Sequence, residues 1–93
     1  MKIAYIIIAH EHPELLARLI NILHKSGGIV VVHYDRKRGK RPIEQLQQIL
    51  GEPFNSIIWA EREAVVWGEW TLVQATLNGI AALQDSGVNP DYV

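Results

Sequence analysis

Two candidate ligand-binding residues directly follow apolar runs that resemble buried strands. His10 comes after the run at residues 3–9, and Asp35 lies just beyond the run at residues 29–33. In open parallel sheets, ligands bind beyond the carboxyl ends of the strands. A carboxylate there can accept hydrogen bonds from ribose hydroxyls or from a base N–H. Asp35 is therefore a candidate nucleotide-binding residue, although its position is equally compatible with a residue that only caps a loop.

A metal site is an alternative for the same region, because imidazole and carboxylate groups suit zinc or iron. The candidate ligands would be His10, His12, His33 and Asp35. The first two histidines lack the i, i+4 spacing of a helical metal site, and histidines at strand ends commonly serve as hydrogen-bond partners. The chain has no Asp-x-Asp motif and no cysteine, which excludes thiolate ligands and a cysteine nucleophile. We therefore predict no metal.

A basic run follows Asp35 and contains five of the nine basic residues of the chain: Arg36, Lys37, Arg38, Lys40 and Arg41. These side chains could reach a diphosphate, or they could simply form a solvated loop. Proteins that bind single-stranded nucleic acids place aromatic residues among the cations, and this run has none. The net charge of the chain is -1, so we expect no nucleic-acid partner. The glycine-rich phosphate loops of dehydrogenases and ATPases are absent as well.

Trp67 and Gly68 lie in a Trp-Gly-Glu-Trp stretch that ends at Trp70. Two tryptophans around a glycine at the start of a helix can form a flat wall against a base or sugar. The alternative is packing beneath the helix, and it applies most directly to Trp70.

The elements that must position these residues alternate between strand and helix. Apolar, β-branched runs predict strands at residues 3–9, 29–33 and 56–60, and residues 91–93 resemble the opening of a fourth. Helical periodicity predicts helices from Pro13 to the glycines at 27–28, over residues 42–50, and from about residue 70 to Ser86. The last of these should face the core with Leu72, Val73, Thr76, Leu77, Ile80 and Leu83. Right-handed crossovers would make the sheet parallel.

The composition is that of one small α/β domain that forms a core. The 93 residues are 48% hydrophobic and 20% charged, which argues against disorder. The apolar run at residues 3–9 is too short to span a membrane and lacks the cleavage site of a secretory signal. We therefore predict a protein without a membrane span in this chain.

Three stretches together resemble the core-2/I-branching β-1,6-N-acetylglucosaminyltransferases, a family that includes the peptide O-xylosyltransferases. They are AYIIIAH at 4–10 with PELLARL at 13–19, VHYD at 32–35, and VWGEWTLVQATLN at 66–78. The resemblance implies a Rossmann-like, GT-A-type fold that binds a UDP-sugar. It further implies transfer of N-acetylglucosamine or xylose, with inversion and without a metal, to a glycan or peptide acceptor.

The resemblance also implies roles for individual residues. Ala9, His10 and Asp35 would border the uridine, Lys37 would lie near the donor, and Trp67 with Gly68 would line the pocket wall. The catalytic base of the family lies later in its domain, and no residue of this chain corresponds to it. The catalytic residues are therefore not assigned.

Residues 1–93 are thus predicted to be a single N-terminal nucleotide-sugar-binding subdomain, incomplete at its C-terminal end and inactive alone. A sheet order of 3-2-1-4 without most of strand four would leave the strand at residues 3–9 at an edge, which predicts a homo-oligomer. Animal members of the family that the chain resembles carry a membrane anchor and cysteines, and this chain shows neither, so the resemblance predicts a bacterial version, cytoplasmic or membrane-peripheral. The alternative from another class is a non-catalytic α/β interaction module or an inactive remnant.

Overall fold

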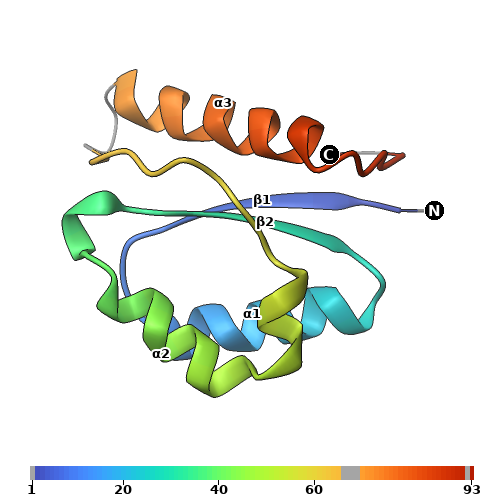
Figure 1. Ribbon diagram of the computed structural model, residues 1–93, viewed down its shortest axis with the longest axis horizontal. Helices are drawn as coiled ribbons and strands as arrows, with labels where there is room; N and C mark the ends of the chain where they lie inside the picture. The colour runs from blue at the N-terminus through green and yellow to red at the C-terminus, as the bar shows by residue number, and fades with distance from the viewer. Residues whose placement is uncertain (1, 66–69, 92) are drawn as a thin grey trace.

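The computed structural model describes residues 2–65, 70–91 and 93, except for the side chains of residues 71 and 72. It is a three-layer arrangement around a parallel sheet (Figure 1). The strands are β1 (Ala4–Ala9), β2 (Ile29–Tyr34) and β3 (Ile58–Trp59), in the order β1-β2-β3. Helices α1 (Pro13–Lys25) and α2 (Arg41–Leu50) cover one face, and α3 (Trp70–Asp85) covers the other. Short 3₁₀ helices occupy Arg36–Arg38 (η1) and Glu52–Ser56 (η2).

The predicted α/β class and parallel sheet are confirmed, but the third strand is shorter than predicted. Residues 56–60 were expected to be extended, whereas Ser56 closes η2 and only Ile58 and Trp59 pair with β2. Pro53 lies at the start of η2, where its fixed φ favours a tight turn, and the N–H of Ile57 donates to the carbonyl of Phe54. The strand therefore cannot begin before this turn ends.

The chain end was predicted to open a fourth strand. Neither Asp91 nor Val93 is in a strand, and Tyr92 lies outside the described residues. Asp91 is instead hydrogen-bonded to Lys2, two residues before β1. Its N–H donates to the carbonyl of Lys2 at 2.8 Å, and its Oδ2 accepts from the N–H of Lys2 at 2.7 Å. The C-terminal segment thus returns to the beginning of β1.

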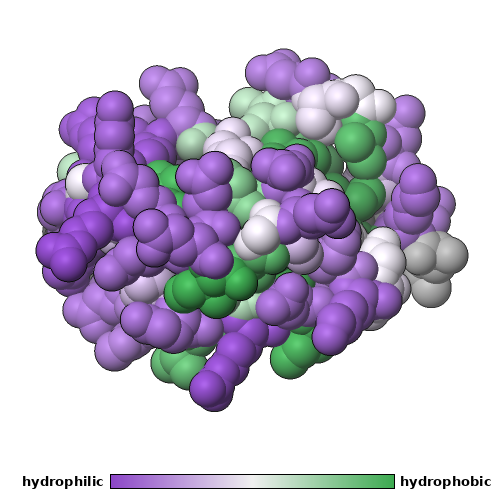
Figure 2. All heavy atoms as spheres, turned by 60° about the horizontal axis from the view of Figure 1, so that its bottom comes forward, coloured by the Kyte–Doolittle hydropathy of each residue, from purple (hydrophilic) through white to green (hydrophobic). Residues whose placement is uncertain are grey.

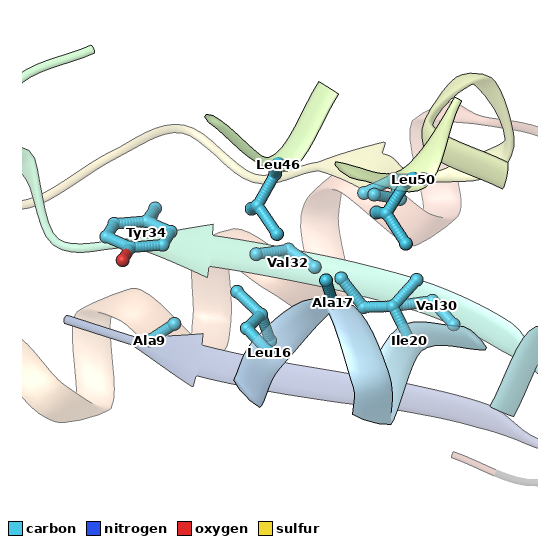
Figure 3. Packing of buried hydrophobic residues seen from close by; sticks show 10 residues of the cluster. Ala9, Leu16, Ala17, Ile20, Val30, Val32, Tyr34, Leu46 and Leu50 are labelled. Atoms are coloured by element: carbon cyan, nitrogen blue, oxygen red, sulfur yellow. The ribbon is translucent and has the colours of Figure 1, made fainter. Parts of the chain in front are cut away.

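The main core lies between the sheet and the layer of α1 and α2 (Figure 3). Pro13 at the first helical turn and Glu14 beside it suit the positive end of α1, and the helix ends before Gly27, whose φ is 83°. One face of α1 then packs on alternate residues of β2. The buried residues are Ala9, Leu16, Ala17, Ile20, Val30, Val32, Tyr34, Leu46, Leu50 and Ile57. Each large side chain buried here contributes roughly 1.5–3 kcal/mol.

Helix α3 faces the sheet with a different side from the one predicted. Val73, Leu77 and Ile80 are 44%, 47% and 37% exposed, while the small residues Ala75 and Gly79 are buried. Of the predicted core face Leu83 is buried, Thr76 is exposed, and the side chain of Leu72 lies outside the description. Trp70 is 69% exposed rather than packed in the core.

Close contact between helix and sheet explains this rotation of α3. A Cβ at Gly79 would lie 2.7 Å from Cγ2 of Ile6, closer than real carbon atoms approach. The small residues therefore let α3 lie directly on β1 and β2, and Leu83 packs with Ala4 and Val31 beneath it. A helix turned to bury its larger residues would be forced away from the sheet.

Several large apolar side chains remain on the surface. Figure 2 shows apolar patches among mostly hydrophilic side chains on the side of α1 and α2. On α1 the exposed apolar residues are Leu15, Leu19 and Ile22, which are spaced along one helical face. Over the described ranges, no helix combines the length and apolar character needed to cross a membrane.

Candidate functional site

The carboxyl ends of β1 and β2 meet, as the parallel pairing predicted. Ala9 is paired with Tyr34 at the end of the ladder, and the N–H of Asp35 donates to the carbonyl of Ala9 at 2.8 Å. Two of the residues singled out from sequence, Ala9 and Asp35, are therefore direct neighbours. Both are buried, with exposed fractions of 8% and 2%.

The carboxylate of Asp35 is held by two backbone groups. Its Oδ1 accepts from the N–H of Lys37 at 3.0 Å and from the N–H of Val65 at 3.1 Å. The first bond caps η1, so Asp35 does cap a loop, and the second joins β2 to a segment 30 residues later. The other oxygen, Oδ2, lies 3.7 Å from Nζ of Lys37.

The electrostatic setting favours the charged form of Asp35. Burial by itself would raise the pKa of this carboxyl group, because desolvation disfavours a charge. The hydrogen bonds from Lys37 and Val65 and the positive charges of Lys37 and Arg38 outweigh burial, and the pKa is lowered below its ordinary value. Asp35 is thus an ionised acceptor at the junction of two strand ends.

Lys37 and His10 lie on different elements beside this junction. The side chain of Lys37 is half exposed on η1. His10 follows β1 and lines a groove of about 320 Å³ with residues of β1 and α1, among them Ala9, Leu15 and Leu19. An ion pair at 3.1 Å between Arg38 and Glu11 ties η1 to the loop that contains His10.

Trp67 and Gly68, the remaining residues of the predicted site, lie outside the described residues. The structure does place Val65, two residues before Trp67, on the carboxylate of Asp35. Val65, the last described residue before Trp67 and Gly68, is therefore in direct contact with the carboxylate that we predict to bind the nucleotide.

For His33 the sequence left open a metal ligand or a hydrogen-bond partner at a strand end, and its surroundings are those of a buried hydrogen-bond acceptor. It is fully buried, and its Nε2 accepts from the N–H of Glu63 at 2.8 Å. Burial lowers its pKa below 6.5, which favours the neutral ring that this bond requires. Nowhere in the described part of the chain do three histidine or acidic side chains cluster as a metal site would need.

Arg62 was missed entirely by the sequence analysis. Its Nε donates to the carbonyl of Tyr34 at 2.8 Å, and its Nη2 donates to the carbonyls of Asp35 at 2.8 Å and Gly39 at 2.6 Å. All three acceptors are backbone atoms, and backbone atoms carry no side-chain signal. An arginine between two glutamates is otherwise indistinguishable from a solvated surface residue.

Comparison with known proteins gives a consistent family match. The family model described as "Branch: Core-2/I-Branching enzyme" matches residues 3–93. A human β-1,3-galactosyl-O-glycosyl-glycoprotein β-1,6-N-acetylglucosaminyltransferase is 29% identical over 91 residues, which are 98% of this chain and 21% of the relative. A second human enzyme, with the same name followed by the number 3, is 33% identical over 90 residues, 97% of this chain and 20% of the relative. The chain spans about a fifth of the length of these relatives.

The origin of the relatives contradicts one prediction. A bovine herpesvirus 4 enzyme of the same name is 31% identical over 91 residues, 98% of this chain and 21% of the relative, and further relatives come from cattle, mouse and zebrafish. The inference of a bacterial protein, cytoplasmic or membrane-peripheral, is therefore wrong. It was drawn from the missing cysteines and missing anchor, and neither absence identifies an organism or a compartment.

Proposed function

Because the chain belongs to the Core-2/I-branching enzyme family, we propose that it forms the donor-nucleotide side of an inverting, metal-independent glycosyltransferase. The donor is a UDP-sugar, and the transferred sugar is N-acetylglucosamine or xylose, passed to a glycan or peptide acceptor. The names of the relatives, β-1,6-N-acetylglucosaminyltransferases, favour N-acetylglucosamine.

One observation carries the proposal: an ionised carboxylate is anchored where two parallel strands end. Among the described residues, Oδ1 of Asp35 accepts from two backbone N–H groups and Oδ2 has only the ammonium group of Lys37 beside it, at 3.7 Å, so we take Oδ2 as the oxygen for a ligand. Oδ2 would accept from the uracil N–H or a ribose hydroxyl, with Ala9 and His10 bordering the uridine. The Trp67 and Gly68 segment would then form the wall of the pocket.

The charge of the diphosphate requires positive partners. Lys37 is the nearest candidate, because its ammonium group lies 3.7 Å from Oδ2 of Asp35 and its side chain is half exposed. We propose that cationic side chains, rather than a metal ion, balance the diphosphate. UDP affinity should then be the same with and without a chelator.

Isothermal titration calorimetry tests the donor site directly. The chain should bind UDP more tightly than ADP, and Asp35→Ala should weaken UDP binding about tenfold to a hundredfold, the equivalent of one charged hydrogen bond of roughly 1.5–3 kcal/mol. Asp35→Asn keeps an oxygen for the backbone N–H groups but also presents an NH₂ group to the ligand, so it should fold and still bind UDP poorly. Asp85→Asn, which removes an exposed carboxylate at the end of α3, is the matched control.

Three results would count against the proposal. Equal affinity for UDP and ADP would favour the non-catalytic module, and loss of binding on chelation would place a metal in the site. Unchanged UDP affinity in Asp35→Asn would show that the nucleotide binds elsewhere.

A further inference from the structure

Arg62 joins three points of the backbone around the candidate donor site. Its guanidinium group donates at 2.6–2.8 Å to carbonyls at the end of β2, Tyr34 and Asp35, and at the end of η1, Gly39. The acceptors lie on either side of residues 36–38, the first part of the basic run. One side chain therefore closes the loop in which Lys37 lies.

The topology of the sheet explains why Arg62 can reach these carbonyls, of which that of Asp35 also accepts from the N–H of Arg38 at 3.1 Å. The last paired residue of β2 on the β3 side is Val32, which faces Trp59, so β2 continues past the end of β3. Tyr34 and Asp35 thus extend beyond the ladder on that side. Gly39, with a φ of 67°, turns the chain so that its own carbonyl also faces the guanidinium group.

The segment that carries Arg62 is itself fastened to β2. The N–H of Ala60 donates to Val32, and the N–H of Arg36 donates to the carbonyl of Glu63, both at 3.0 Å. Glu63 is also held by α3, because Asn78 of that helix donates to Oε1 of Glu63 at 3.2 Å. The backbone at Arg62 is therefore fixed on both sides, and its side chain reaches the loop from a rigid base.

We propose that Arg62 is a positioning residue of the donor site: it locks the loop of residues 36–39 onto the end of β2 and thereby holds Lys37 beside Asp35. The inference rests on the proposed function, since Lys37 is taken as the partner of the diphosphate. A planar guanidinium group has donors that diverge toward separate acceptors, whereas a lysine ammonium is a single point of charge. Lysine should therefore replace Arg62 only in part.

Hydrogen exchange measures the loop without any ligand. In Arg62→Gln, the amides of Lys37, Arg38 and Gly39 should exchange at least tenfold faster, while the amides of the ladder between β1 and β2 keep their protection. Arg18→Gln is the matched control: it removes the same charge from an exposed residue of α1, outside the basic run, and should change loop exchange less than twofold. If Arg62→Gln fails to fold, Arg62→Lys serves, with an expected increase of at least threefold.

Affinities for UDP and for uridine distinguish a specific role in positioning Lys37 from a general loss of order in the donor site. Arg62→Gln should weaken UDP binding at least tenfold relative to Arg18→Gln but weaken uridine binding less than threefold, because Val65 still anchors the Asp35 carboxylate. Equal losses for both ligands, or unchanged loop exchange, would overturn the inference. If the unaltered chain does not prefer UDP to ADP, the proposed function fails, and the exchange experiment still decides whether Arg62 orders the loop.

Discussion

Substitution of Gly79 by alanine tests the close packing of α3 on the sheet. A methyl group at Gly79 would lie 2.7 Å from Cγ2 of Ile6. That atom belongs to a β-branched side chain with a stiff χ1, so it cannot swing aside at little cost. Overpacking of this kind costs about 1–3 kcal/mol, and a contact this short belongs in the upper part of the range.

A second effect has the opposite sign. Glycine inside a helix is about 1 kcal/mol less favourable than alanine, so the substitution also favours the helix. The net loss of stability for Gly79→Ala should then be about 1–2 kcal/mol. In an Ile6→Ala background the clash is absent, and the same substitution should stabilise the protein by roughly 0.5–1 kcal/mol.

Urea unfolding of the four proteins in this double-mutant cycle measures the change of sign. A buffer that contains sulfate keeps the Ile6→Ala variants folded at zero denaturant, and equal m-values show that the unfolded states are comparable. Ala81→Gly, at an exposed position of α3, calibrates the helix contribution and should cost about 1 kcal/mol. Stabilisation by Gly79→Ala in both backgrounds to the same extent would refute the close-packing explanation.

The other predictions concern the site and the assembly. Asp35→Ala should lower the free energy of unfolding by about 2–4 kcal/mol, because the buried N–H of Val65 and the partly buried N–H of Lys37 lose a charged acceptor, and Asp35→Asn should recover much of this in chemical denaturation. Burial lowers the pKa of His33 below its unfolded value of 6.5. As the pH falls, the His33 ring is therefore protonated in the unfolded chain before it is protonated in the folded chain. The contribution of His33 to stability should therefore be full above about pH 6.5 and fall as the pH drops below it. His33→Gln should flatten this pH dependence between pH 7.5 and 5. An unchanged slope would contradict the conclusion that His33 is buried as a neutral ring. Within the described residues β1 has a strand on one side only, so a homo-oligomer is still expected. Light scattering that shows a monomer at high concentration would exclude it.

Much of the fold follows from short-range patterns in the sequence. Continuous β-branched runs indicate strands buried on both faces, and the helical spacing of Leu16 and Ile20 predicts the side of α1 that packs on β2. The position of Asp35 after the second strand placed it at the carboxyl edge of a parallel sheet, and the structure joins it there to Ala9. These features depend on residues that are close in sequence or on the strong handedness of the crossover.

The tertiary structure alone decided which side of α3 is buried and what holds the loop after β2. Apolar periodicity ranks the sides of a helix by hydrophobicity, but packing against a sheet also depends on how closely the helix and strand backbones approach. In this protein the close contact of Gly79 with the side chain of Ile6 determines that distance. The partners of Arg62 are backbone carbonyls about 25 residues away in sequence, which no pattern of side chains reveals. The burial of His33 likewise depends on the segment around Glu63 lying across the end of β2. Each of these outcomes rests on contacts between distant segments, and these contacts exist only once the chain has folded.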